Sequence, residues 1–462
     1  MSSDSPGMNI KAREKAASRM ARRELSRTLA VLLVMNVATL GGLSCARSPI
    51  VPPDPPTHAI LITIDTLRAD RLGAYGYDQA STPNLDALAG ESIRFERAYS
   101  HSSKTFPSIS TLLSGRPVAE HGIYNNSGSF PENMPTLATS LEDAGFETAA
   151  FIGSYALRPN RGLTRGFDSY TQEYLTTEAV RPHPENRAGA LTDEAIAWFS
   201  TRNSDHPLFL WIHYQEPHGA YTPPTFRETD RESGGPVLRR NPTNTGRDGI
   251  PAYQWLGHGR LDEYQARYDG EITEFDRHLR RLMKALKTTG ILERSILVLT
   301  GDHGEAFGEE GLYCTHGEGL LDVVLRVPLL VKIPGHQPEV RTDRVRLIDI
   351  SRTVLETLRL DAFGFQGHSL FQNIGDRTVV AQMDAQGERW RSYRSGVFEL
   401  RQVSGQRAIL HAPPGVSAED SATVFERLQR NLSASAPWPE AMENEQLSQQ
   451  ERDALKAMGY LD

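Results

Sequence analysis

Cysteine is scarce in this chain, which holds only Cys45 and Cys314 in 462 residues. Cys45 closes an N-terminal segment that we expect to be processed at that residue. The mature chain would then have no second thiol partner, which excludes a fold stapled by internal disulfides.

An excess of positive charge is also missing. The formal net charge is −8, which argues against a nucleic-acid-binding protein and against a polybasic membrane binder. Hydrophobic residues make up 39% of the chain and charged residues 23%, a composition that excludes disorder and is typical of globular proteins. No internal repeat is visible, so the length allows two or three domains or one large α/β domain with an appendage.

Basic residues cluster only at the N-terminus. They precede an uncharged run at residues 28–44, and the sequence GLSCA follows with Cys45. This order predicts an export signal over residues 1–45, and Cys45 resembles the lipidated residue of a bacterial lipoprotein. The alternative is a membrane-spanning anchor, because the run reaches the lower length limit. We expect an exported protein, periplasmic or at the cell surface, that a proline-rich tether over 46–57 connects to the membrane.

Strand and helix patterns alternate after the tether. AILITID at 59–65 and PLFLWIHY at 207–214 are buried-strand patterns, and Thr82-Pro83 is a helix-start pattern. The alternation predicts an α/β fold, a largely parallel sheet sandwiched by helices, over residues 58–375. A long Pro-, Gly- and Arg-rich insertion near 222–258 interrupts it. From 376 to 462 the pattern predicts a small C-terminal α+β domain with a terminal tail.

Polar residues follow three of the predicted strands. Asp65 ends the first, Asp302 and His303 follow LVLTG, and His213 and His218 belong to WIHYQEPH. Function in open α/β sheets gathers at the carboxyl ends of strands. Thr105, at the start of a short helix, joins them; alone it would be read as an ordinary N-cap. Two carboxylates and an imidazole suit a divalent cation, which lowers the pKa of a hydroxyl.

These segments resemble the sulfatase family of the alkaline phosphatase superfamily. TIDTLRADRLGAYGY, STPNLDALAGESIRFERAYS, residues 105–116, EPHGAY, TGDHGE and LRVPLLVKIPG occur in the family's order, over roughly residues 58–375. GHSLF and the closing ALKAMGYLD also fit. The resemblance implies the alkaline phosphatase/sulfatase-like fold and an ester hydrolase.

The chain departs from the usual sulfatase pattern at its centre. A typical sulfatase has Cys or Ser, converted to formylglycine, in C-x-P-S-R; this chain has Thr105-Phe106-Pro107-Ser108-Ile109. The family's GKWH segment is replaced by residues 153–156, and Thr66 stands where a second aspartate is usual. These departures resemble the threonine-nucleophile branch of the superfamily, which includes nucleotide phosphodiesterases and phosphoglycerol transferases.

The resemblance implies a role for each matched residue. Asp65, Thr105, Asp302 and His303 would bind one divalent metal ion (Ca, Mg, Mn or Zn), with Thr105 also the nucleophile. His218 and His316 would be substrate contacts or the general acid. Asn125, Asn126 and Lys104 are candidate substrate-binding residues, and His213 is expected to pack beneath the site.

Three functions follow from this interpretation. The favoured one is a metal-dependent hydrolase or transferase that acts on phosphate esters through Thr105, with a small-molecule, lipid or glycan ester as substrate. The alternatives are a sulfuric ester hydrolase that works without formylglycine and a non-catalytic sulfatase-like binding lipoprotein.

Overall fold

The computed structural model describes residues 54–171, 174, 185–202, 205–224, 235–385, 387–434 and 447–460. The predicted export signal, Cys45 and most of the proline-rich tether lie outside these residues, as does part of the insertion. No helix within the described ranges combines the length and the apolar character needed to cross a membrane.

An eight-stranded sheet forms the core of the folded unit, in the order β10-β2-β9-β6-β1-β5-β3-β4. Its neighbouring pairs are parallel except those of β9, which runs antiparallel to both β6 and β2. The strands are β1 (His58–Ile64), β2 (Ile93–Tyr99), β3 (Glu147–Ile152), β4 (Ser169–Tyr170), β5 (Leu208–Tyr214), β6 (Ser295–Gly301), β9 (Arg326–Lys332) and β10 (Glu339–Arg346). The prediction of a largely parallel sheet is confirmed.

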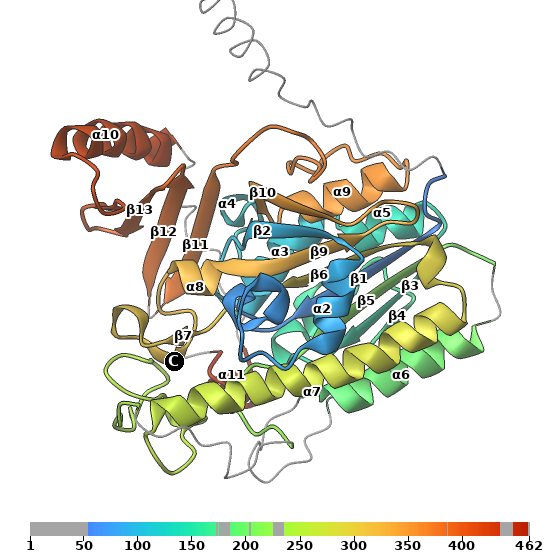
Figure 1. Ribbon diagram of the computed structural model, residues 1–462, viewed down its shortest axis with the longest axis horizontal. Helices are drawn as coiled ribbons and strands as arrows, with labels where there is room; N and C mark the ends of the chain where they lie inside the picture. Colours follow the sequence, from blue (N-terminus) through green and yellow to red (C-terminus); the bar gives the residue numbers. More distant parts are fainter. Residues whose placement is uncertain are drawn as a thin grey trace, which may run out of the picture. The chain divides into compact units, whose positions relative to one another are not determined.

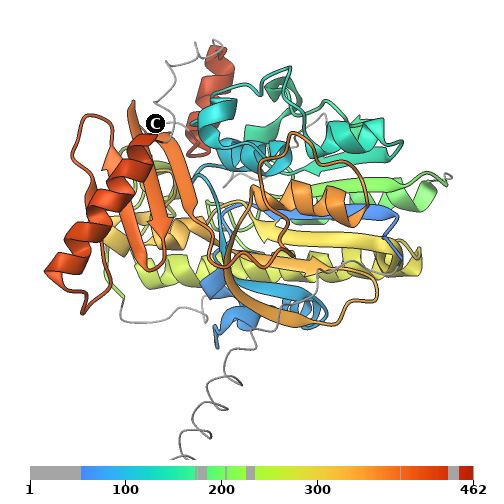
Figure 2. The ribbon, with the colours of Figure 1, turned by 90° about the horizontal axis from the view of Figure 1, so that it is seen from above.

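Helices cover both faces of this sheet (Figures 1 and 2). On one face lie α2 (Pro83–Gly90), α6 (Ala188–Thr201) and the long α7 (Leu261–Thr288). On the other lie α3 (Thr105–Ser114), α5 (Leu137–Asp143) and α9 (Asp349–Thr357), with the short α4 (Val118–His121) and α8 (Asp322–Leu325) near one edge. The central strands β1, β5 and β6 are buried along their whole length, because helices shield them from water on both sides.

Local signals in the sequence place several of these helices. Thr82 and Pro83 stand at the N-cap and first position of α2, as predicted. Gly290, with φ +71°, follows the end of α7. Apolar side chains on α7 recur at helical spacing and pack on the sheet, so that Phe275, Leu279 and Leu282 are fully buried.

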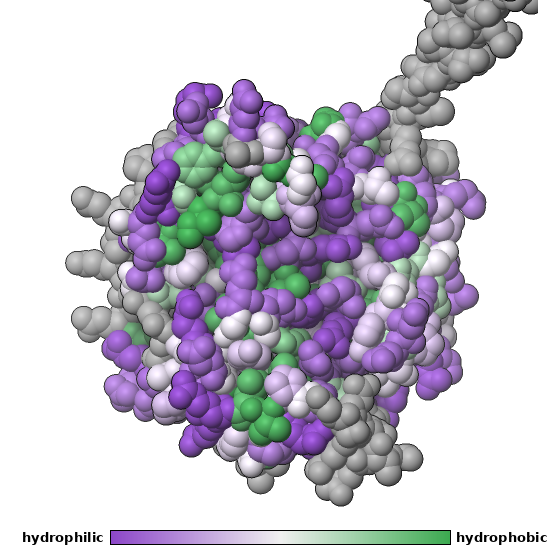
Figure 3. All heavy atoms as spheres, turned by 60° about the vertical axis from the view of Figure 1, so that its left-hand side comes forward, coloured by the Kyte–Doolittle hydropathy of each residue, from purple (hydrophilic) through white to green (hydrophobic). Residues whose placement is uncertain are grey.

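A second sheet of four antiparallel strands follows the main domain. It contains β11 (Val379–Ala385), β12 (Glu388–Ser395), β13 (Phe398–Val403) and β14 (Ile409–His411), with α10 (Ala418–Ala434) packed against it. Val379, Ala381 and Met383 of β11 join a core cluster with Leu325 of the main domain, so the sheet is fastened to that domain. Figure 3 shows the molecule turned so that this region comes toward the viewer. The visible face is mostly polar, with small separated apolar patches. The small two-stranded sheet β7 (Ala306–Phe307) and β8 (Tyr313–Thr315) precedes α8.

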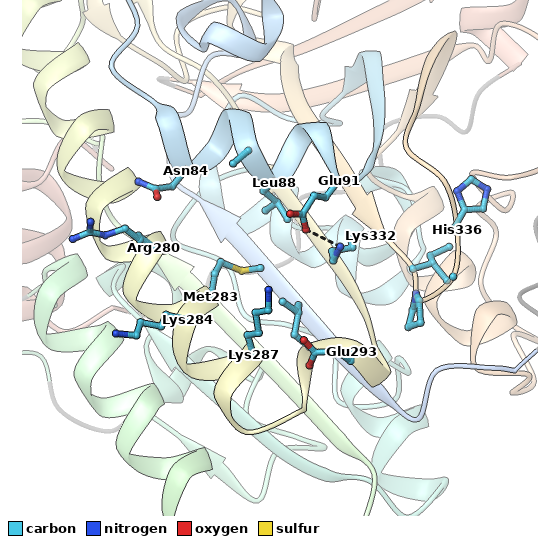
Figure 4. A pocket seen from close by; sticks show the side chains of 15 residues that line it. Asn84, Leu88, Glu91, Arg280, Met283, Lys284, Lys287, Glu293, Lys332 and His336 are labelled. Carbon is cyan, nitrogen blue, oxygen red and sulfur yellow. Dashed lines mark hydrogen bonds and ion pairs between the residues drawn. The ribbon is translucent and has the colours of Figure 1, made fainter.

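A cavity of about 560 Å³ lies between α2, α7 and the loop after β9 (Figure 4). Leu88, Met283 and Leu292 form apolar parts of its lining, and Lys332 pairs with Glu91 at 2.9 Å. Leu292 directly precedes β6, so the cavity is at the amino-terminal edge of the parallel strands. It is therefore at the edge of the sheet opposite to the strand ends that carry the predicted site residues.

Candidate active site

The carboxyl ends of β1 and β6 place two aspartates side by side. Asp65 follows β1 and Asp302 follows β6, the neighbouring parallel strand, and both are fully buried. Asp302 Oδ1 accepts hydrogen bonds from the backbone N–H groups of Thr66 (3.1 Å) and His303 (2.7 Å). Asp65 Oδ1 and Asp302 Oδ2 have no hydrogen-bond partner. Buried carboxylate oxygens without donors are costly, so this geometry suits a cation between them.

The backbone bends sharply just after Asp65. Thr66 adopts a positive φ of 57°, a rare conformation for a β-branched residue. Tyr268 of α7 holds the bend, since its hydroxyl donates to the Thr66 carbonyl at 2.7 Å and accepts from the Arg68 N–H. The bend turns the Thr66 N–H toward Asp302. Strain of this kind is typical of functional sites.

Thr105 is the first residue of α3, and its hydroxyl faces the aspartates. Thr105 Oγ1 is 3.4 Å from Asp65 Oδ2 and 3.3 Å from His303 Nε2. The N-cap position belongs to Lys104, so Thr105 does not serve as the ordinary helix cap. Both separations exceed the usual length of about 2.8 Å for a hydroxyl hydrogen bond. The hydroxyl is thus presented to the site at the positive end of a buried helix.

Further hydrogen bonds fix the first turns of α3. Ser108 Oγ donates to the carbonyl of Asp302 at 2.7 Å and contacts Ser100 Oγ at 2.9 Å. Asn126 Oδ1 accepts from the Phe106 N–H at 2.9 Å, and the buried Arg161 guanidinium bonds the Asn126 carbonyl. These bonds hold Thr105 at a set distance from the loop that carries Asp302.

Asn126 therefore has a positional contact besides its predicted role in substrate binding. We expect Asn126→Ala to lower stability by about 1 kcal/mol, because an N-terminal N–H of α3 loses its acceptor. Turnover should fall roughly 10- to 100-fold, because Thr105 is no longer held in place. Asn84→Ala is the matched control, since Asn84 bonds Asp276 near the start of α2, away from the site. Equal loss of activity in both variants, measured beside thermal midpoints, would contradict this role.

Histidines complete the cluster. His303 Nε2 lies 3.8 Å from Asp65 Oδ1 and 3.6 Å from Asp302 Oδ2. His213 was expected to pack beneath the site, but the structure also brings its Nε2 to 3.7 Å from Asp65 Oδ2. Its Nδ1 bonds Thr63, and Nε2 has no hydrogen-bond partner. Asp65, His213 and Asp302 form a group whose ligand atoms lie within 4.8 Å of one another. His213 thus joins the candidate ligands.

Burial sets the charge of these groups. Burial lowers the pKa of His303, so its imidazole is neutral near pH 7. Burial and the neighbouring charge of Asp65 raise the pKa of Asp302 well above its usual value. Burial alone would also raise the pKa of Asp65, but the imidazoles of His218, His213 and His303 hold it low. Without a cation, the site therefore disfavours the simultaneous ionisation of both carboxyl groups.

His218 and His316 lie beside this cluster. Their ring centroids are 5.0 Å apart, and His316 is 4.7 Å from His303. His316 Nδ1 contacts Glu305 Oε1 at 3.2 Å, which leaves Nε2, without a hydrogen-bond partner, to face the site. Burial lowers the pKa of His218 to about 4 and that of His316 well below its ordinary value.

The two other predicted substrate-binding residues, Lys104 and Asn125, differ in their contacts. Lys104 is buried close to His316: a Cβ on the neighbouring Gly317 would lie 2.9 Å from Lys104 Nζ. Asn125 is half-buried, and its Oδ1 accepts from the N–H and hydroxyl of Ser127. Lys104 thus lies beside the histidine and aspartate cluster, whereas Asn125 bonds a residue two positions along its own loop.

Sequence reasoning missed one residue entirely. Tyr460, near the C-terminus, is buried, and its hydroxyl donates to Asp65 Oδ2 at 3.0 Å. The closing motif ALKAMGYLD was the one available signal. Nothing in its spacing indicated that it contacts a residue almost four hundred positions away.

The profile of the family described as Sulfatase matches residues 57–360, about two thirds of the chain. This chain belongs to the sulfatase family. The resemblance inferred from the motifs is therefore confirmed, and with it the activity class, ester hydrolysis.

Individual relatives of this sulfatase-family protein are distant. An arylsulfatase from Clostridium perfringens is 25% identical over 417 residues, covering 76% of this chain and 83% of the relative. N-acetylglucosamine-6-O-sulfatase from Bacteroides thetaiotaomicron is 22% identical, covering 65% and 67%. Among solved structures, the phosphonate monoester hydrolase of Silicibacter pomeroyi has a TM-score of 0.68 at 20% identity, covering 85% of this chain and 98% of that one. The structural likeness supports the fold alone.

Proposed function

We propose that this protein is a metal-dependent hydrolase or transferase that cleaves phosphate or sulfate esters, with phosphate esters preferred and Thr105 as the nucleophile. One observation carries the proposal: the Thr105 hydroxyl lies within 3.4 Å of both Asp65 and His303 at the start of a buried helix. A hydroxyl in this place can react with an ester or bind a cation.

Asp65, Asp302, His303 and His213 would hold the cation, and Thr105 would complete the set. Their donor atoms fit a divalent ion, because two buried carboxylate oxygens and the His213 Nε2 lack hydrogen-bond partners. When bound, the ion would lower the pKa of the hydroxyl and offset charge on the ester.

The chain's own residues supply the rest of the reaction. Thr105 Oγ forms a bond to phosphorus while the bond from phosphorus to the leaving oxygen breaks, which leaves a phosphothreonine. The proton of the Thr105 hydroxyl would pass to the imidazole of His218 or His316, which burial keeps neutral near pH 7, and that imidazole would then deliver it to the leaving oxygen. The buried Lys104 would offset negative charge on the non-bridging oxygens. Water or an acceptor alcohol then attacks phosphorus and restores Thr105, which gives hydrolysis or transfer.

Sulfuric ester hydrolysis without formylglycine is the second candidate, because the curated relatives named above are sulfatases. Sulfate and phosphate esters are both tetrahedral oxyanions, so the site geometry accommodates either. Thr105, which stands where a typical sulfatase has Cys or Ser, favours phosphate esters as substrates.

A paired substrate panel tests the preference. We expect the full-length chain to hold one divalent ion per molecule and to cleave aryl phosphodiesters faster than the matching aryl sulfates. Metal content would be measured by plasma mass spectrometry and turnover by release of the same nitrophenol. Faster cleavage of the sulfates would make the second candidate correct. Absence of both metal and turnover would favour a non-catalytic binding lipoprotein.

A further inference from the structure

The C-terminal segment Leu447–Tyr460 packs against the edge of the catalytic centre. It contains α11 (Gln449–Ala457), which starts with a capping box between Ser448 and Glu451. Leu455 and Met458 are buried in a small apolar cluster with Ala156, in the loop after β3. Glu451 pairs with Arg158 of the same loop at 3.0 Å. These contacts fasten the segment to the main domain independently of Tyr460.

Gly459 lets the chain turn into the site. It has φ +79°, and a Cβ at this position would lie 2.4 Å from the ring of Tyr253. Only glycine fits so close an approach in this conformation. The next residue, Tyr460, is consequently directed inward.

The Tyr460 hydroxyl has a complete set of partners. Gln215 Nε2 donates to it at 3.0 Å, and Ser154 Oγ lies 2.7 Å away. Tyr460 has one proton to give, and the Asp65 carboxylate, at 3.0 Å, is the strongest acceptor beside it. The bond engages Asp65 Oδ2 and leaves Oδ1, which has no hydrogen-bond partner and lies 3.8 Å from His303 Nε2.

The ring of Tyr460 supports a second site residue. Its centroid is 4.7 Å from that of His218, on a loop that follows β5. His218 Nδ1 contacts the Gly219 carbonyl at 2.9 Å, which helps to fix the orientation of the ring. The phenol therefore contacts a candidate metal ligand through its hydroxyl and a candidate acid through its ring.

We propose that Tyr460 is a positioning residue of the active site, which the C-terminal segment supplies: its hydroxyl selects the Asp65 oxygen that meets the cation, and its ring holds His218. The inference rests on the proposed function, because it assigns the cation to Asp65. Partners that bond a metal ligand commonly contribute 10- to 100-fold to metal affinity.

Tyr460→Phe in the full-length chain tests the hydroxyl. The ring remains, so the fold and the His218 contact should persist. We expect the Kd for Mn²⁺, measured by calorimetry on protein stripped of metal, to rise roughly 10- to 100-fold. Tyr170→Phe is the matched control: it removes a buried hydroxyl that donates to the Leu157 carbonyl, and it should leave the Mn²⁺ affinity unchanged. An unaltered Kd in Tyr460→Phe would overturn the role of the hydroxyl.

Tyr460→Leu tests the ring. If the ring positions a group that protonates the leaving oxygen, its loss should reduce kcat more for alkyl esters than for nitrophenyl esters, which need little protonation. An equal loss on both substrates would overturn this part. The two proposals fail differently. A wild-type chain that binds no Mn²⁺ and cleaves no ester refutes the proposed function together with this inference, whereas an active wild type beside unaffected variants refutes only the inference.

Discussion

Replacing Thr105 with alanine is expected to abolish turnover while the protein stays folded. The oxygen that we propose as the nucleophile is lost, and no second hydroxyl takes its place within reach of both Asp65 and His303 among the described contacts. Loss of a nucleophile in enzymes that form covalent intermediates typically lowers kcat by a factor of about 10³ or more. Thr105→Ser should keep part of the activity, since the oxygen remains.

Thr111→Val is the matched control for Thr105→Ala. It removes another buried hydroxyl of α3, one that bonds His121 Nε2 at 2.9 Å. We expect Thr111→Val to lower the thermal midpoint at least as much as Thr105→Ala, without a comparable effect on kcat. Turnover by Thr105→Ala within tenfold of the wild type would contradict a nucleophilic role. Absence of turnover in the wild type, together with intact biological function of Thr105→Ala, would favour a non-catalytic protein.

Asp302→Asn is expected to remove metal binding and to stabilise the metal-free protein. Asparagine keeps the oxygen that accepts from Thr66 and His303, so the loop remains bonded. Burial and the neighbouring Asp65 raise the pKa of Asp302, so its ionised form is unfavourable without a cation, and the neutral amide avoids that cost. The metal-free variant should therefore melt at the same temperature as the wild type or higher.

The signature of this variant is the loss of the metal-dependent thermal shift. A ligand at 100 times its Kd stabilises the native state by about 2.7 kcal/mol, which raises the wild-type midpoint. Scanning fluorimetry with and without Mn²⁺ should show this rise for the wild type and none for Asp302→Asn. Asp276→Asn, at a buried aspartate that bonds the start of α2, serves as control and should keep the rise. A preserved shift in Asp302→Asn would place the cation elsewhere.

Low pH is expected to weaken binding of the cation at this site, because its carboxylate ligands must be deprotonated. Protons compete with a cation for Asp65 and Asp302, and burial beside Asp65 raises the pKa of Asp302, so this carboxylate takes up a proton more readily than an exposed one. Metal affinity is therefore expected to fall as the pH decreases, in line with the deprotonated ligands that the site requires.

Much of the fold could be predicted because its signals are local. Short, mostly apolar runs such as residues 59–64 are typical of strands buried on both faces, and their alternation with helices favours a parallel sheet. Thr82, Pro83 and Gly290 mark helix ends through their own backbone preferences. The direction of β9 was not readable, because a buried strand has the same pattern whichever way it runs.

The candidate site was partly readable for a similar reason. Asp65 and Asp302 each follow a strand, and adjacent parallel strands bring their ends together by hydrogen bonding alone. We expected His213 to pack beneath the site, because the sequence pattern of a histidine within a buried strand is the same for a packed side chain and for a metal ligand. Only the pairing of β5 with β1 brings its ring to Asp65.

By itself, the sequence determined the α/β architecture, the family and the strand-end residues, since these depend on periodicity and on motifs read over short stretches. The tertiary structure alone decided that Asn126 holds the start of α3, that His213 faces Asp65 and that Tyr460 enters the site from the C-terminus. Contacts between residues hundreds of positions apart depend on how layers pack, and side-chain packing is set by the whole chain rather than by any segment of it.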